Sequence, residues 1–194
     1  GMVTIPLMAN TVLGSSALEG GLYLLRMTLA IAVAALLGGA ISQRYGARLP
    51  AVSGLVLVVI GYFAMSRWDN TIGDPWLTIH LVICGSGFGL LIAPITQSAL
   101  HYTARQDWGA RASIVTLSRL IGMTLGLAAL IAWGTARFSS LTENTPQISI
   151  DPESISVFTD AAVNAAVMVF QGFFTAAAII GIIALVPVVL MTRR

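Results

Sequence analysis

Long, uninterrupted runs of apolar residues dominate this sequence and restrict the folds that it can form. Each run approaches the roughly 20 residues that an α-helix needs to cross a hydrocarbon layer about 30 Å thick. The runs are continuous rather than alternating, which favours helices over the strands of a membrane barrel. Only 9% of the 194 residues are charged and the mean hydropathy is +0.88, whereas a soluble domain carries about 25% charged residues. The sequence therefore predicts an all-α integral membrane protein.

Breaks between the apolar runs divide the chain into one partial span and five complete ones. Residues 1–14 are too few to cross a membrane, and we interpret them as the end of a helix whose beginning is missing. The complete spans are expected at about 17–42, 50–66, 75–100, 112–134 and 161–190. The last span is longer than a bilayer needs, so we expect it to tilt or protrude.

Two of the expected spans begin with recognisable capping patterns. Ser16-Ala17-Leu18-Glu19 matches a capping box, in which the hydroxyl and the carboxylate each bond to a free backbone N–H. Asp74-Pro75 combines an N-cap acid with a proline at the first helical position. Asp151-Pro152-Glu153 repeats this start, and we expect it to open a short interfacial helix within the long polar loop over residues 136–160.

The arginines indicate how the spans are oriented, because the chain has no lysine. If the odd-numbered spans run outward, six loop or terminal arginines lie inside (44, 48, 105, 111, 193 and 194) and two lie outside (67 and 137). Basic residues concentrate on the cytoplasmic side of membrane proteins. We therefore expect a multi-pass protein of the plasma (bacterial inner) membrane, with residues 43–49 and the C-terminus in the cytoplasm.

Two further arginines fall inside expected spans, where a charge is costly and usually faces the bundle interior or a watery cavity. Arg26 lies about 9 residues into its span, and it either lines a cavity as a fixed positive charge or extends outward along its helix. Arg119 either lines a cavity or bonds to a neighbouring helix. It shares a helical face with Gly122 and Gly126, a pair that lets another helix approach closely, so we favour a packing role.

The fourth span combines small residues, a proline and an amide. Gly85, Gly87 and Gly89 narrow the helix, and Pro94 removes a backbone hydrogen bond. Gln97 adds a polar group near the inner end. Two interpretations fit this pattern: close helix packing alone, or a cavity-lining helix with a flexible joint. No cluster of histidine, cysteine or carboxylate side chains lies within the spans, so we expect no metal, cofactor or enzyme active site.

Residues 39–48, GAISQRYGAR, resemble the cytoplasmic loop motif G-x-x-x-D-R/K-x-G-R/K-R/K of the major facilitator superfamily. In that family the loop joins the second and third helices of each six-helix half, and here it joins the second and third spans. VLGSSALEGGLYLL, GSGFGLLIAP and GARASIVTLSRLIGMTLGLA also resemble the C-terminal half of the fourteen-span drug:proton antiporter-like branch. The resemblance covers nearly the whole chain and implies a single C-terminal transmembrane half-domain over residues 1–194.

The loop motif has a physical interpretation. Gly39 and Gly46 would let two helices turn back within a few residues. Arg44 and Arg48 would anchor the turn at the surface and pair with carbonyls at helix C-termini. The family implies a latch that holds one transport conformation. Gln43 replaces the family's acidic residue, and an amide makes no charge-assisted bond, so we expect a weak latch.

The resemblance implies a secondary active transporter, with proton-coupled efflux of hydrophobic or amphipathic small molecules. Its partners would be the lipid bilayer, the missing N-terminal half and a small-molecule substrate, and not nucleic acid. No acidic residue lies within a span, so the coupling carboxylate would belong to the missing sequence, with His80 the alternative here. A different class also fits: a non-transporting half-length membrane protein that serves as a lipid-binding or assembly subunit.

Overall fold

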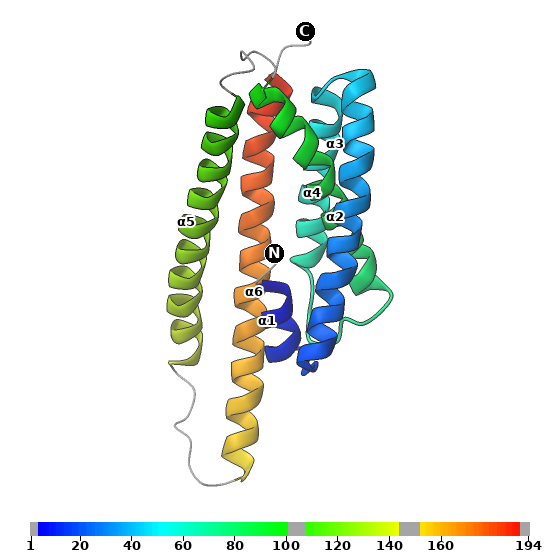
Figure 1. Ribbon diagram of the computed structural model, residues 1–194. Helices are drawn as coiled ribbons and strands as arrows, with labels where there is room; N and C mark the ends of the chain where they lie inside the picture. Colours follow the sequence, from blue (N-terminus) through cyan, green and yellow to red (C-terminus); the bar gives the residue numbers. More distant parts are fainter. Residues whose placement is uncertain (1–3, 101–107, 144–151, 191–194) are drawn as a thin grey trace.

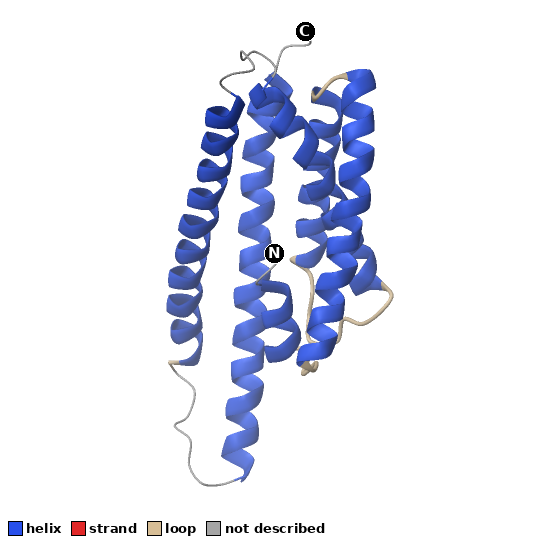
Figure 2. Ribbon diagram, in the orientation of Figure 1, coloured by secondary structure: helices blue, strands red, loops and turns tan. Residues whose placement is uncertain are grey.

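One short helix and five long ones make up the part of the chain that the structure describes (Figure 1). The computed structural model describes residues 4–100, 108–143 and 152–190. Its elements are α1 (Thr4–Thr11), α2 (Ala17–Tyr45), α3 (Arg48–Met65), α4 (Trp76–Leu100), α5 (Trp108–Thr142) and α6 (Pro152–Leu190). These residues contain no strand (Figure 2), and α2 to α6 are long and apolar enough to cross a membrane. The predicted all-α membrane fold is confirmed.

The start of α2 is set by the capping box that the sequence predicts. The Ser16 side chain accepts from the backbone N–H of Glu19 at 3.3 Å, and the Glu19 carboxylate accepts from the backbone N–H of Ser16 at 2.8 Å. At its other end the helix is capped by Gly46, whose φ of 83° is one that glycine adopts without strain. The Gly46 N–H donates to the carbonyl of Ser42 at 3.0 Å, and α3 begins two residues later.

The turn between α2 and α3 lies at the same end of the bundle as the C-terminal end of α6 (Figure 1). A hydrogen bond joins the two: Arg48 Nη2 donates to the carbonyl of Val189 at 2.6 Å. This arrangement agrees with the expected topology, in which these segments share one side. The opposite end holds α1, the start of α2 and the α3–α4 loop.

Helices α5 and α6 are longer than the apolar runs from which their spans were predicted. Helix α5 continues to Thr142 instead of ending near residue 134, and α6 already begins at Pro152. The expected short interfacial helix after Asp151 is therefore wrong as a separate element, because its residues form the first turns of α6. No glycine or proline lies in 135–142 or 153–160, and polar residues alone do not end a helix. Residues 144–151 of the expected loop lie outside the described residues.

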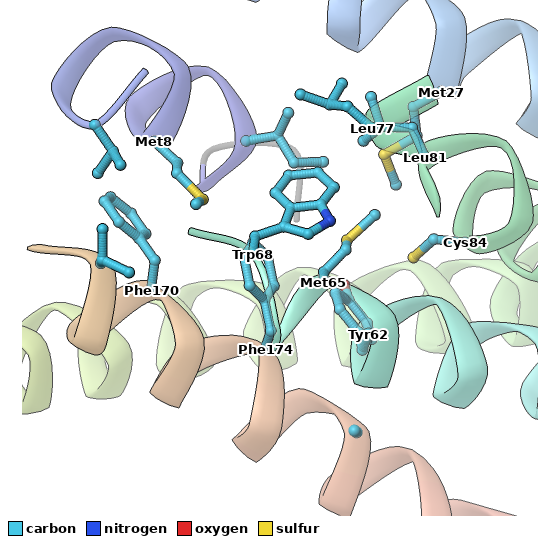
Figure 3. Packing of buried hydrophobic residues seen from close by; sticks show 14 of the residues in the cluster. Met8, Met27, Tyr62, Met65, Trp68, Leu77, Leu81, Cys84, Phe170 and Phe174 are labelled. Carbon is cyan, nitrogen blue, oxygen red and sulfur yellow. The ribbon is translucent and has the colours of Figure 1, made fainter. Parts of the chain in front are cut away.

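The core forms where α1, α3, the α3–α4 loop, α4 and α6 meet (Figure 3). Trp68, only 2% exposed, occupies its centre. The Trp68 ring packs edge-on against Phe174, with ring centroids 5.8 Å apart. Its indole N–H donates to Nδ1 of His80 at 2.9 Å, and its carbonyl accepts from Gln171 at 2.7 Å. One loop residue thus connects α4 with α6.

Helix α4 approaches α2 closely because glycines lie at the contact. A Cβ added at Gly85 would lie 2.6 Å from the carbonyl oxygen of Met27. One added at Gly89 would clash with the carbonyl of Ile31 and lie 2.7 Å from the Cβ of Ala34. Spacing of four residues puts both glycines on one helical face. This contact supports the packing interpretation of these two glycines.

The opposite face of α4 packs against α3 in the same manner. A Cβ at Gly87 would lie 2.6 Å from the carbonyl oxygen of Gly54, and a Cβ at Gly54 would lie 2.8 Å from that of Gly87. Further along, a Cβ at Gly61 would lie 2.7 Å from the Cβ of Cys84. Helix α4 is therefore held between α2 and α3, and its position relative to α2 is fixed by backbone contact.

Candidate functional site

An open groove of about 480 Å³ lies along the surface where α2 and α4 meet. Its walls come from one stripe of α2 and one stripe of α4. The lining residues are Arg26, Leu29, Ala30, Val33, Ala34, Leu37, Thr78, Val82, Ser86 and Leu90. The α2 residues recur at intervals of three and four and the α4 residues at intervals of four, so each set occupies one helical face. The groove is therefore a continuous trough of mostly aliphatic side chains.

The polar end of this groove is a network of three side chains. The Arg26 guanidinium lies 2.8 Å from both carboxylate oxygens of Asp74 and also donates to the hydroxyl of Thr78. The Thr78 hydroxyl in turn donates to Asp74. Asp74 precedes α4 and Thr78 lies in its first turn, so the network joins α2 to the start of α4. We call it the Arg26 network.

Electrostatics in the Arg26 network keep the Asp74 carboxylate ionised. Hydrogen bonds from Thr78 and from Arg26, together with the positive charge of Arg26, hold the pKa of Asp74 below its usual range. The ion pair balances the two charges, although both side chains remain partly exposed, at 38% and 49%. Arg26 thus lies at the groove, one of the two positions considered for it, and its positive charge is paired with the negative charge of Asp74. Arg26 also lies less deep in the bundle than its position about 9 residues into the expected span suggested, because its guanidinium lies level with the start of α4.

The other candidate residues of the fourth span differ in whether they pack against a helix or face the groove. Gly85 and Gly89 face α2 as described above, and Pro94 is fully buried. Ser86 lies between the two glycines in sequence but faces the groove. Helix α4 thus combines close packing with a groove-lining face. The side chain of Gln97 lies outside the described residues.

The Arg119, Gly122 and Gly126 face does not make the expected contact with another helix of this chain. All three residues are exposed, and a Cβ added at either glycine would meet no atom within 4 Å. Helix α5 instead packs on α6 near Gly134 and Trp133, whose ring lies 5.5 Å from that of Phe173. Within the described residues, this face of α5 is uncovered.

The loop motif is only partly arranged as the sequence indicated. Gly46 makes the turn, whereas Gly39 lies inside α2. A Cβ added at Gly39 would lie 3.9 Å from the Cβ of Ala93, an ordinary contact. The expected turn role of Gly39 is therefore wrong, because α2 continues to Tyr45. Arg48 bonds to a carbonyl at the end of α6. Arg44 lies in the last turn of α2, and both it and Gln43 are exposed.

Sequence reasoning missed the function of Asp74 beyond capping, and it missed Thr78 entirely. The available signal was the spacing Asp74-x-x-x-Thr78, which puts a hydroxyl one helical turn after an acid. His80 was considered as a titratable group, but its Nδ1 accepts the indole N–H of Trp68. That bond requires an unprotonated Nδ1, so the geometry gives His80 a structural role.

Comparison with known proteins gives consistent results. The family model of the Major Facilitator Superfamily matches residues 2–194. The triacylglyceride transporter of Mycolicibacterium hassiacum is 35% identical over 71% of this chain and 28% of its own length. That of Mycolicibacterium smegmatis is 34% identical over 71% of this chain and 26% of its own length. The triacylglyceride transporter of Mycobacterium tuberculosis is 28% identical over the whole of this chain and 40% of its own length.

The chain thus spans between 26% and 40% of the length of these three relatives. The relatives' names describe transporters and not enzymes. The family match covers nearly every residue, including the loop motif, the α2–α4 groove and α5. This chain belongs to the major facilitator superfamily.

Proposed function

We propose that the chain is the C-terminal half of a secondary transporter that moves neutral, lipid-like molecules out of the bacterial inner membrane. The observation that carries this proposal is the α2–α4 groove, which is aliphatic along its length and ends in the charge-balanced Arg26 network. The names of the relatives, triacylglyceride transporters, support the same substrate class.

The chemistry of the groove favours apolar substrates over sugars or charged metabolites. A polar group that leaves water without a hydrogen-bond partner costs several kcal/mol, roughly 2–7 depending on the reference. The groove offers few partners: Arg26, Thr78 and Ser86 are its polar lining residues. A substrate with few polar groups and a long hydrocarbon part therefore loses least on entering.

The rest of the transporter would cover the open face of α5. An arginine within a membrane span needs a partner or water, and no hydrogen bond or ion pair within the described residues involves Arg119. A helix from the N-terminal half would supply that partner and pack against Gly122 and Gly126, where small residues permit close approach. Substrate would then bind between the two halves, near the α2–α4 groove.

Transport would be proton-coupled efflux, with the C-terminal end of α6 in the cytoplasm. The cytoplasmic assignment follows from the distribution of loop arginines. The coupling carboxylate would belong to the rest of the protein, because Asp74 is held ionised by Arg26 and Thr78. Proton coupling needs a group that gains and loses a proton during the cycle, and Asp74 does not meet this requirement near neutral pH.

Reconstitution tests the proposed function directly. The full-length protein that contains this chain is placed in proteoliposomes loaded with a fluorescent triacylglycerol. The appearance of the fluorescent lipid in acceptor vesicles is then followed with and without a proton gradient. We expect transfer that stops when a protonophore collapses the gradient, and weaker transfer of a cationic lipophilic dye. Transfer that needs ATP and ignores the gradient would overturn the mechanism. Binding of lipid without any transfer would favour a lipid-binding subunit.

A further inference from the structure

The α2–α4 groove has a polar end and an apolar length, and we propose that it binds one acyl chain of a neutral ester lipid with the ester group at Arg26. The proposal rests on the proposed function and specifies how its substrate is held. It also gives the Arg26 network a role in choosing between neutral and anionic lipids, which a purely structural ion pair would not have.

The length of the groove matches one acyl chain. From Arg26 to Leu37 the α2 wall extends by 11 residues, and from Thr78 to Leu90 the α4 wall extends by 12. At 1.5 Å per residue these walls are about 17 Å long. That is roughly half the 30 Å thickness of a hydrocarbon core, the depth that acyl chains of one leaflet fill. An acyl chain lying in the groove would therefore contact both helices along its whole length.

The polar end can accept an ester without giving up its own bonds. Arg26 uses Nη1 for Asp74 and Thr78, whereas a guanidinium carries five N–H donors. Its side chain is 38% exposed, so donors remain accessible to a ligand in the groove. An ester carbonyl is an acceptor without charge, and it can take one of these donors while Asp74 keeps its place.

The same geometry disfavours an anionic headgroup. A fatty-acid carboxylate or a phosphate at this end would compete with Asp74 for Arg26 and would be repelled by the Asp74 carboxylate. Like charges brought together in a partly desolvated site disfavour the wrong ligand, which is how a binding site gains specificity. Removal of the Asp74 charge should therefore invert the preference, leaving Arg26 free to pair with an anion.

Photocrosslinking tests the binding position. The full-length protein in detergent is irradiated with a monoacylglycerol that carries a diazirine at the end of its acyl chain, and the labelled residues are mapped by mass spectrometry. We expect labels near Leu37 and Leu90. Leu29→Trp fills the groove and should lower this labelling about tenfold, a change that corresponds to roughly 1.4 kcal/mol. Leu36→Trp is the matched control, because Leu36 is exposed on α2 but does not line the groove.

Competition tests the selectivity. The free fatty acid with the same diazirine chain should label wild-type protein about tenfold less than the monoacylglycerol, and Asp74→Asn should reverse that order. Equal labelling of Leu29→Trp and Leu36→Trp, labels away from the groove, or an unchanged order in Asp74→Asn would each overturn the proposal. These labelling measurements do not require transport. Lipid transfer without labelling of the groove would therefore reject the proposed binding position but not the proposed function. Groove labelling without transfer rejects only the proposed function.

Discussion

The guanidinium of Arg26 on α2 lies 2.8 Å from the carboxylate of Asp74, 48 residues further along the chain. This contact places the one charged group of the α2–α4 groove beside an opposite charge at the start of α4. Glycines fix the two helices against each other along the rest of the groove, so we expect the ion pair to contribute little to holding the helices together.

Arg26→Ala and Asp74→Asn should each lower stability only slightly. Both side chains are more than a third exposed, and ion pairs of that exposure contribute up to about 1 kcal/mol. A double-mutant cycle of thermal unfolding in detergent measures the coupling. Substrate preference should change much more than the midpoint of unfolding in both variants. A coupling of several kcal/mol would show that the pair is a main structural support instead.

The Asp74 carboxylate should contribute an acid-sensitive component of stability. Its pKa in the folded protein is lowered by the Thr78 hydrogen bond and by Arg26. A group with a depressed folded pKa stabilises fully above its unfolded pKa, which is about 3.9 for aspartate. That contribution is lost as the pH falls further through the folded pKa. Unfolding midpoints measured between pH 3 and 7 should therefore be flat above about pH 5 with respect to this group.

Variants separate this effect from that of a neighbouring acid. The pKa of Asp69 is also lowered, by side-chain and backbone hydrogen bonds from Thr71. Asp74→Asn should remove the acid dependence that comes from Asp74, and Thr78→Val should reduce that same component. Asp69→Asn should remove a different component, which Thr78→Val leaves unchanged. An acid dependence identical in wild type and Asp74→Asn would contradict the ionised pair.

Gly89→Leu should prevent proper packing of α4 on α2. Any side chain at this position meets the Ile31 carbonyl and the Cβ of Ala34, and backbone cannot move aside as a flexible side chain can. Overpacking of this kind costs about 1–3 kcal/mol or more. Gly21→Leu is the control, because a Cβ there meets nothing within 4 Å. Fluorescence-detected size exclusion should show aggregation for Gly89→Leu and a monodisperse peak for Gly21→Leu.

The contrast between two glycine pairs shows what the sequence does and does not encode. Gly85 and Gly89 have the same spacing as Gly122 and Gly126, so both pairs predict a close helix contact. Only the first pair finds its partner within the described chain, since α2 lies against α4. Spacing identifies a face suited to close approach, but it carries no information on which helix fills that face. Arg26 and Asp74 were likewise each identified from the sequence. Their contact with each other could not be predicted, because it depends on how α2 packs against α4.

Helix ends were predicted less well than spans for a related reason. Hydropathy marks the part of a helix that lies in hydrocarbon, whereas helix ends depend on capping and on glycine or proline. The capping box at Ser16 was therefore found correctly. The extensions of α5 to Thr142 and of α6 back to Pro152 are polar and were assigned to a loop.

Trp68→Ala should be among the most destabilising substitutions in the chain. The indole is 2% exposed and packs against Phe174 and His80, and truncation of a buried tryptophan costs about 3–5 kcal/mol. Trp68→Phe keeps most of the ring contacts but loses the N–H bond to His80, at a cost of about 1 kcal/mol. Thermal unfolding of both variants gives the order. A Trp68→Phe variant as unstable as Trp68→Ala would make the hydrogen bond, not the packing, the principal term.

Gly122→Leu tests whether the open face of α5 is covered by the rest of the transporter. A Cβ added at this position meets no described atom within 4 Å, so we expect a half that stood alone to tolerate leucine there. If a helix of the N-terminal half packs there, the added side chain should lower the yield of folded full-length protein and abolish lipid transfer. Ala128→Leu is the matched control, because six residues at 100° each place Ala128 on a different face of α5 and Ala128 is also exposed. Equal yields and transfer rates for the two variants would mean that this face contacts lipid, and the proposed position of the second half would then be wrong.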